Sequence, residues 1–140
     1  MALPNWKIPF IVETSGATVV AEESCVGERS TRDLVDETGK TLDQMIDAVT
    51  DRYMKIDCAC FTPNEERVGH ILDLTKDFKA SGVIHYSIQF CTPYSTEAYK
   101  VEKALQGMGI PCLKIETDYG MEDMGQLKTR VEAFLEMVRK

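Results

Sequence analysis

The chain lacks long hydrophobic runs, an excess of basic residues and the motifs of several large enzyme classes. No apolar stretch approaches the roughly 20 residues that cross a bilayer, so no membrane-spanning segment is predicted. A formal net charge of −7, from 16 Lys and Arg against 23 Asp and Glu, argues against nucleic acid, which requires a basic face. The sequence has no glycine-rich phosphate loop, nucleophile elbow or zinc-protease motif.

The start of the chain also lacks a targeting signal. Residues 1–7 do not show the basic-then-apolar order of a signal peptide, so we expect a cytoplasmic protein. In a reducing compartment, cysteines serve more often as ligands, catalysts or core residues than as disulfides, and the odd count of five agrees with this. No repeat, linker or low-complexity run divides the 140 residues, which predicts one α/β domain over residues 1–140.

The hydrophobic periodicity predicts helices that alternate with short strands. Strands are expected at 17–22, 83–90 and 110–117, where β-branched residues cluster. Helices are expected at 5–14 with a bend at Pro9, at 41–55 with a capping box of Thr41 and Gln44, from Thr62 to near Gly82, and at 96–108 and 125–140. We therefore predict an α/β three-layer sandwich with a small parallel sheet of three to four strands flanked by helices.

Four of the five cysteines occupy positions where such a fold places functional groups. Cys25, Cys58, Cys60 and Cys91 fall just after expected strands or in a loop that enters a helix. Loops at the carboxyl ends of parallel strands are the usual binding edge of an open α/β sheet. Thiols from three segments at that edge favour a soft-metal site, most naturally an iron–sulfur cluster. Cys112, inside the last expected strand, fits a packed core position instead.

Other interpretations of these residues stay open at this stage. Cys58 and Cys60, two apart in an extended loop, point to opposite sides, which suits two adjacent metals better than chelation of one. A stand-alone redox or zinc-binding module using the same pair is the main alternative, and a flavin or CoA-binding edge is a third. The remaining polar candidates have structural interpretations at least as good, namely His70, His85, Arg29, Glu116, Asp118 and Tyr119.

Several stretches together resemble a known family, the 2-hydroxyacyl-CoA dehydratases and benzoyl-CoA reductases of the 2-hydroxyglutaryl-CoA dehydratase D-component type. The closing block Gly125–Glu136 is the most specific of them, and the others lie at 4–9, 23–27, 82–84, 90–94 and 109–111. Family members are longer, so the resemblance implies that this sequence corresponds to their C-terminal α/β domain.

The resemblance also implies a cofactor and its ligands. Family subunits hold an iron–sulfur cluster with two cysteines from an upstream part and at least one that matches Cys91. Cys25 and the 58–67 segment resemble the double-cubane subgroup, in which six thiolates hold two cubanes. The four cysteines here plus two upstream make six. The expected cofactor is thus a 4Fe–4S cluster or a double-cubane 8Fe–9S cluster, bound in part by Cys25, Cys58, Cys60 and Cys91.

By the same resemblance, the chemistry is low-potential electron transfer in a dehydratase or reductase component. The implied partners are the upstream domains, a separate ATP-hydrolysing iron–sulfur activator protein, and a small-molecule or CoA-thioester substrate. We expect the isolated domain to be inactive because the two upstream ligands are absent. The sulfurs of Cys25, Cys58 or Cys60, and Cys91 should lie within roughly 5–12 Å of one another at the carboxyl edge of the sheet, with Cys112 buried elsewhere.

Overall fold

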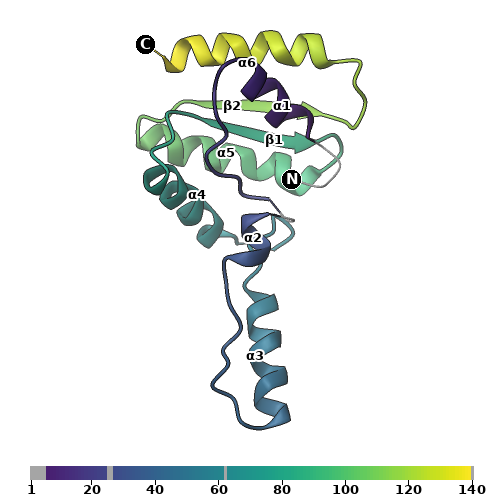
Figure 1. The fold of residues 1–140 in the computed structure, drawn as a ribbon, viewed down its shortest axis with the longest axis vertical. Coiled ribbons are helices and arrows are strands. Elements are labelled where there is room, and N and C mark those ends of the chain that lie inside the picture. Colours follow the sequence, from purple (N-terminus) through teal and green to yellow (C-terminus); the bar gives the residue numbers. More distant parts are fainter. Residues whose placement is uncertain (1–5, 25–26, 62, 140) are drawn as a thin grey trace.

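A computed structural model describes residues 6–24, 27–61 and 63–139 (Figure 1). The elements follow in the order α1 (Lys7–Thr14), α2 (Glu28–Thr31), α3 (Leu42–Met54), α4 (Glu65–Asp77), β1 (Val83–Ile88), α5 (Thr92–Gly107), β2 (Cys112–Thr117) and α6 (Met124–Val138). Within these described residues, none of the helices combines the length and the apolar character needed to cross a membrane.

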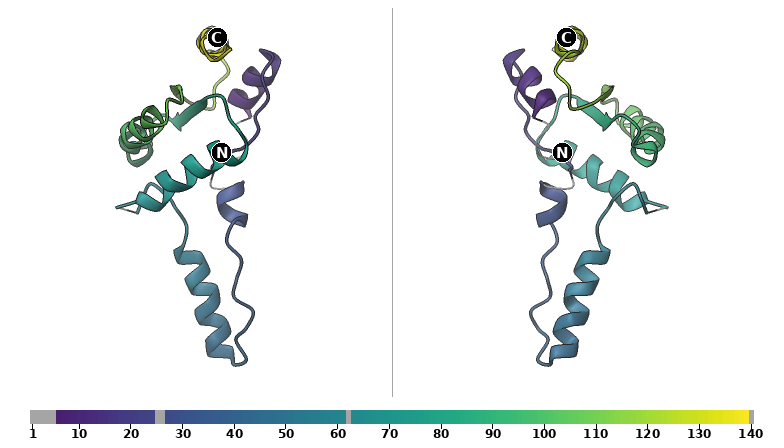
Figure 2. Two further views of the ribbon diagram at one scale, coloured as in Figure 1. Left: turned by 90° about the vertical axis from the view of Figure 1, so that its left-hand side faces the viewer. Right: turned by 90° about the vertical axis from the view of Figure 1, so that its right-hand side faces the viewer.

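The centre of the molecule is a two-stranded parallel sheet. β1 and β2 pair in register from Val83 opposite Cys112 to Ile88 opposite Thr117, and α5 makes the crossover between them. Helices α1 and α6 lie on one face of the sheet, while α4 and α5 lie on the other (Figures 1 and 2). The predicted α/β class and its three layers are confirmed, with the sheet reduced to two strands in the described part of the chain.

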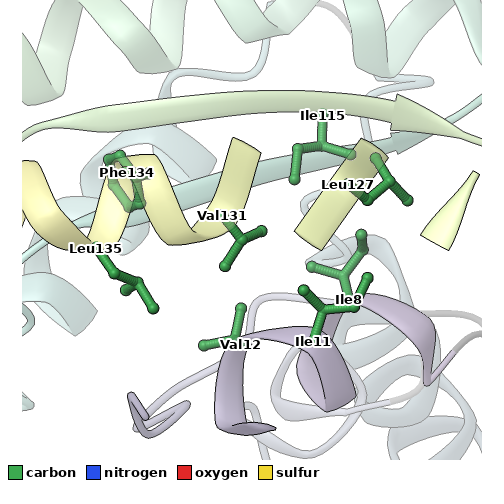
Figure 3. Packing of buried hydrophobic residues seen from close by; sticks show 8 residues of the cluster. All are labelled: Ile8, Ile11, Val12, Ile115, Leu127, Val131, Phe134 and Leu135. Carbon is green, nitrogen blue, oxygen red and sulfur yellow. The ribbon is translucent and has the colours of Figure 1, made fainter. Parts of the chain in front are cut away.

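Two apolar clusters hold the layers together. The larger cluster joins α1, α6 and the Ile115 side of β2 (Figure 3), and its buried members are Ile8, Ile11, Val12, Ile115, Leu127, Val131, Phe134 and Leu135. The smaller one, between the sheet and helices α4 and α5, consists of Ile71, Val101 and Leu105. The α6 residues Leu127, Val131, Phe134 and Leu135 and the α4 residue Ile71 recur at the helical spacing seen in the sequence.

The strand predicted at 17–22 is wrong. This segment forms no ladder with β1 or β2, and it runs as irregular chain from α1 toward α2 (Figure 1). Val19 and Val20, whose branching suggested the strand, are both exposed. A β-branched run fits a pleated surface, but it becomes a strand only where a neighbouring edge pairs with its backbone and covers its side chains.

Several helix boundaries also differ from the prediction. α5 begins at Thr92 rather than Thr96, because Pro93 fits the first turn of a helix, where a missing N–H costs nothing. Pro9 lies in the first turn of α1 for the same reason, so this helix continues through it. α4 begins at Glu65, after Asn64, and Thr62, the predicted N-cap, lies outside the described residues. The one-turn helix α2 was not predicted.

A buried lysine fixes the position of α1 at the carboxyl edge of β2. The Lys7 ammonium donates to Thr117 Oγ1 at 2.6 Å, to the Gly120 carbonyl at 2.7 Å and to Asp123 Oδ1 at 2.8 Å. Three donors thus meet three acceptors, which satisfies a charged group that would otherwise be costly to bury. The contact joins the start of the chain to the loop that precedes α6.

Residues 32–55 form an arm that extends away from this α/β body (Figures 1 and 2). One side of the arm is the extended segment 32–41, and the other is helix α3, which returns toward the body. The predicted capping box at its tip is confirmed, since Gln44 N donates to Thr41 Oγ1 and the Gln44 side chain accepts from Thr41 N. No residue of α3 is buried.

Candidate functional site

Cys91 lies directly after the carboxyl end of β1, where it precedes the first turn of α5. Its side chain is exposed. The residue before it, Phe90, adopts φ of +67° with its side chain 95% exposed. A bulky residue in the left-handed region costs of order 1–3 kcal/mol, so the turn that presents Cys91 is held in place by the structure around it.

Cys58 and Cys60 belong to the tight loop between α3 and α4. Cys58 is half-buried, Cys60 is exposed, and Ala59 between them is buried. The Asn64 side chain donates to the Cys58 carbonyl at 3.1 Å, and the Phe61 N–H donates to the same oxygen at 2.9 Å. The two cysteines thus differ in exposure, and their direction relative to each other stays a prediction.

Cys25 lies outside the described residues, but the chain on both sides of it is anchored. Ser24 Oγ accepts from the Gly27 N–H at 3.2 Å. His70 Nε2 of α4 and Glu28 Oε2 lie 2.6 Å apart, which fastens the following turn to that helix. The segment that carries Cys25 is therefore attached to the same helix whose start carries the Cys58–Cys60 loop.

Arg67, in the first turns of α4, is the centre of a buried charge cluster. It is only 1% exposed, and its guanidinium reaches Glu97 Oε2 of α5 at 2.5 Å and Glu23 Oε2 at 3.1 Å. The same group lies over the ring of Tyr94, 4.3 Å from its centroid. Glu23 also pairs with Arg29. These five residues, Glu23, Arg29, Arg67, Tyr94 and Glu97, are called the Arg67 network below.

The Arg67 network connects the three segments that carry cysteines. Glu23 lies two residues before Cys25, and Tyr94 and Glu97 lie three and six residues after Cys91. Asn64, which holds the Cys58 carbonyl, also lies 3.5 Å from Glu97 Oε2. Buried charges persist only when they are paired and hydrogen-bonded, so this cluster fixes the relative positions of all three loops.

Burial keeps two neighbours of the network neutral. His85 of β1 contacts Tyr94 in a tilted arrangement with 4.9 Å between ring centroids. Burial, reinforced by the Arg67 charge, lowers the pKa of His85 to about 4, so the imidazole is neutral at physiological pH. Burial likewise raises the pKa of Tyr94 above its ordinary value. The charge in this region thus resides on arginine and carboxylate groups alone.

Cys112 is separated from Cys91 by the length of the sheet. It begins β2, opposite Val83, whereas Cys91 follows the far end of β1. The five register steps between these ends correspond to roughly 17 Å at about 3.3 Å per residue. Its thiol is half-buried against the Ile71–Leu105 cluster, and burial raises its pKa. This position matches the core role expected from the sequence.

The described part of the chain contains no group of three His, Cys, Asp or Glu side chains placed to hold a metal ion. It does present thiols on two loops, namely Cys58 and Cys60 in the loop before α4 and Cys91 in the turn before α5. Thiolate sulfur is the donor that iron–sulfur clusters use, and a cluster several ångströms wide can take ligands that are too far apart for one ion. The chemistry of the donor set therefore fits an iron–sulfur cluster completed by further ligands.

Sequence reasoning missed the Arg67 network except for Arg29, which had an ion pair as one of two interpretations. A usable signal was present, because Arg67 precedes the core residues Ile71 and Thr75 at the i, i+4, i+8 spacing of one helix face. A charge on that buried face requires partners from elsewhere. Glu116, by contrast, borders an open depression beside Phe90 and Thr92, which agrees with a solvated edge.

Comparison with known proteins gives one family and several relatives. The profile described as 2-hydroxyglutaryl-CoA dehydratase, D-component, matches residues 1–138. YjiM of Escherichia coli K12, which carries the provisional name of a dehydratase subunit, is 36% identical over 133 residues, 94% of this chain. The (R)-2-hydroxyglutaryl-CoA dehydratase beta subunit of Acidaminococcus fermentans is 31% identical over 84% of the chain, and the (R)-phenyllactyl-CoA dehydratase beta subunit of Clostridium sporogenes is 28% identical over 90%.

These relatives are much longer than the chain. It spans 34% of YjiM, 33% of the Clostridium subunit and 32% of the Acidaminococcus subunit. About two thirds of each relative therefore has no counterpart in the 140 residues.

Proposed function

Because the chain belongs to the 2-hydroxyglutaryl-CoA dehydratase D-component family, we propose that it forms the C-terminal domain of a dehydratase or reductase component and supplies thiolate ligands to an iron–sulfur cluster. The proposed ligands are Cys25, Cys58, Cys60 and Cys91. The remaining ligands come from the part of the component that precedes this domain. The cluster supplies one-electron chemistry when it is bound.

One observation carries this proposal, the junction of three cysteine-bearing segments at the Arg67 network. Arg67 pairs with Glu23 from the Cys25 segment at 3.1 Å and with Glu97 from the helix that follows Cys91 at 2.5 Å. The loop with Cys58 enters the same helix as Arg67 and is held by Asn64. Ligands for a cluster must be held in fixed relation, and a paired buried charge provides that rigidity.

The finer identity of the cluster follows from the number and direction of the thiols. A single cubane with two upstream ligands would require only one or two of these cysteines. Cys58 and Cys60 differ in exposure, and residues two apart in an extended loop are expected to point to opposite sides, which suits two adjacent cubanes. We therefore favour a double-cubane 8Fe–9S cluster over a single 4Fe–4S cluster.

The proposed component has partners beyond its own upstream domains. An ATP-hydrolysing iron–sulfur activator protein delivers the electron, and a CoA thioester or another small molecule is the substrate. Cys91 and Cys60 are both exposed, so thiolates at these positions face outward from the α/β body, where a second domain can close over the cluster. The isolated chain holds one wall of that site and is inactive alone.

Anaerobic reconstitution of the full-length component with iron and sulfide tests the proposal. Wild-type protein should bind iron and sulfide in a fixed ratio with a cluster electron-paramagnetic signal after reduction. Cys91→Ser and Cys58→Ser should each lose iron, whereas the matched control Cys112→Ser should retain the wild-type content. If Cys112→Ser loses as much iron as Cys91→Ser, the proposed ligand set is wrong.

A further inference from the structure

The arm carries an apolar surface that nothing in the described structure covers. Along one side of α3, five residues recur at helical spacing, namely Leu42, Met45, Ile46, Val49 and Tyr53, here called the arm stripe. Leu42 is 71% exposed, Ile46 53% and Tyr53 60%. Isolated apolar residues are common on protein surfaces, but a contiguous stripe along a whole helix is typical of an interface.

Hydrogen bonds and an ion pair near the base of the arm hold α3 in place. Arg52 donates through Nε to the Asp33 carbonyl at 3.0 Å and through a terminal nitrogen to the Ser30 carbonyl. Arg32 pairs with the buried carboxylate of Asp57 at 2.7 Å, where the arm rejoins the body. With the capping box at the tip, these contacts fix α3 against the extended segment without burying any part of the stripe.

The other residues of α3 lie on two sides of the arm stripe, which differ in their contacts and charge. Gln44 and Arg52 bond to the extended segment, and Ala48, half-buried between them, marks the same side of the helix. On the other flank of the stripe lie Asp43 and Asp47, four residues apart, whereas Asp51 lies further round the helix and pairs with Lys55 at 2.8 Å. At 100° per residue this places an acidic row beside the apolar one.

This arrangement disfavours antiparallel pairing of the arm with a second copy of itself. Two α3 helices packed antiparallel through their stripes would bring each aspartate row against the same row of the other copy, and like charges at close range oppose association. A parallel pair would instead bring that row against the flank that carries Arg52, Arg32 and Lys40 as well as acidic residues. The experiment below therefore includes a dimer among its outcomes.

We propose that the arm stripe docks into an apolar groove, rimmed by Lys or Arg side chains, on a different protein chain. The apolar residues fill the groove, and the row of Asp43 and Asp47 meets the basic rim. The arm leaves the body after α2 and returns at Asp57, next to Cys58. A chain held by the arm is therefore anchored beside the thiols. The proposal stands on the arm alone and is independent of cluster binding.

Two synthetic amphipathic helical peptides serve as probes. They share one leucine stripe and differ only in flanks of lysine or of glutamate. By fluorescence anisotropy, the 140-residue chain should bind the lysine-flanked peptide, and added salt should weaken binding. Ile46→Asp should weaken it roughly tenfold or more, as for a central interface residue. Asp43→Asn with Asp47→Asn should weaken it less and reduce the salt dependence.

A matched control separates binding by the arm from nonspecific binding of the basic peptide to an acidic protein. Met137→Asp changes a similarly exposed apolar residue on α6 of the body and should leave binding at the wild-type level. Ile46→Asp should unfold at the wild-type urea concentration, because its side chain is not part of a core. Loss of binding with an unchanged unfolding midpoint therefore reports on docking itself.

Three results would overturn the proposal. The first is equal binding of the lysine-flanked and glutamate-flanked peptides. The second is a dimer of the chain in sedimentation velocity that Ile46→Asp dissociates, since the occupant would then be a second copy. The third is failure of the full-length component to bind the lysine-flanked peptide that the 140-residue chain binds, since the rest of the same component would then cover the stripe.

Discussion

The α/β body and the arm use the same kind of sequence pattern with opposite outcomes. Helices α5 and α3 both carry apolar residues at helical spacing, yet Leu105 of α5 is fully buried and Leu42 of α3 is largely exposed. The difference lies in what surrounds each helix, because α5 has a sheet and α4 to pack on, whereas α3 has only one extended segment. Periodicity therefore identifies a face that needs a partner, but not where that partner is.

The same contrast holds for charge. In the body, Arg67 and Lys7 are almost completely buried, and each has several acceptors from distant segments. On the arm, the Lys55–Asp51 pair is local and exposed. Buried pairs fix long-range geometry, while exposed pairs contribute little to stability. Substitutions should accordingly have large effects in the body and small ones on the arm.

The largest effect is expected for Arg67→Met. Removing the guanidinium leaves Glu97 without its closest partner and should cost about 3–5 kcal/mol of unfolding free energy, as for other broken buried pairs. Urea denaturation followed by circular dichroism measures it. Lys100→Met, which removes the exposed pair with Glu65, is the control and should change stability little. Equal midpoints for the two variants would show that the network does not brace the body.

Leu105→Ala is expected to have the next largest effect. Its side chain is in the centre of the cluster with Ile71 and Val101, so truncation should cost about 2–5 kcal/mol through lost burial and a residual cavity. The matched substitution on the arm is Leu42→Ala, which leaves no cavity. A similar shift in the urea midpoint for both would contradict the division between body and arm.

A smaller effect should appear in the contribution of His85, in the body, to the pH dependence of stability. Unfolding restores the pKa of His85 from about 4 to near 6.5, so between these values the unfolded chain binds more protons. The contribution of His85 is therefore complete above pH 6.5 and falls by about 2 kcal/mol between pH 7.5 and pH 5. Urea unfolding at both pH values should show this loss in wild type and not in His85→Phe. Parallel losses in the two proteins would mean that His85 is not held neutral.

The smallest effect is expected for Ile46→Ser on the arm. It should change the unfolding free energy by less than about 0.5 kcal/mol, because the residue makes no core contact. The measurement sharpens the comparison, since a large loss of stability would show that the stripe is already covered within the chain. Asp57→Asn, which breaks the pair with Arg32 at the base of the arm, provides a contrasting variant that should destabilise more.

Much of this architecture was predictable from the sequence, and the exceptions share a cause. Helices α1, α3, α4, α5 and α6, strands β1 and β2, the packing of Cys112 against a core cluster and the capping box at Thr41 follow from local patterns. The failed strand at 17–22 depended on a pairing edge that β1 and β2 do not offer it. The sequence could not show that Glu23, Arg67 and Glu97 meet, because they lie 30 or more residues apart and only folding brings them together.

The position of Cys91 was also predictable, since a cysteine just after a strand lies at the carboxyl edge of the sheet. The strained turn at Phe90 was not, because a bulky residue with positive φ is unusual and no local signal favours it. Nor could the sequence indicate whether the arm packs on the body. Its stripe has the periodicity of a core helix, and only the arrangement of the elements shows that the body does not cover it.

The most direct test of the central claim is whether the thiols of the three segments are neighbours in solution. A short fluorescent bis-alkylating reagent, applied to the reduced chain and followed by peptide mass spectrometry, identifies which cysteines it bridges. The account predicts bridges among Cys25, Cys58, Cys60 and Cys91, none to Cys112, and their loss in Arg67→Met under conditions where that variant stays folded. Bridges that include Cys112 as often as Cys91, or none that join Cys91 to another segment, would contradict it.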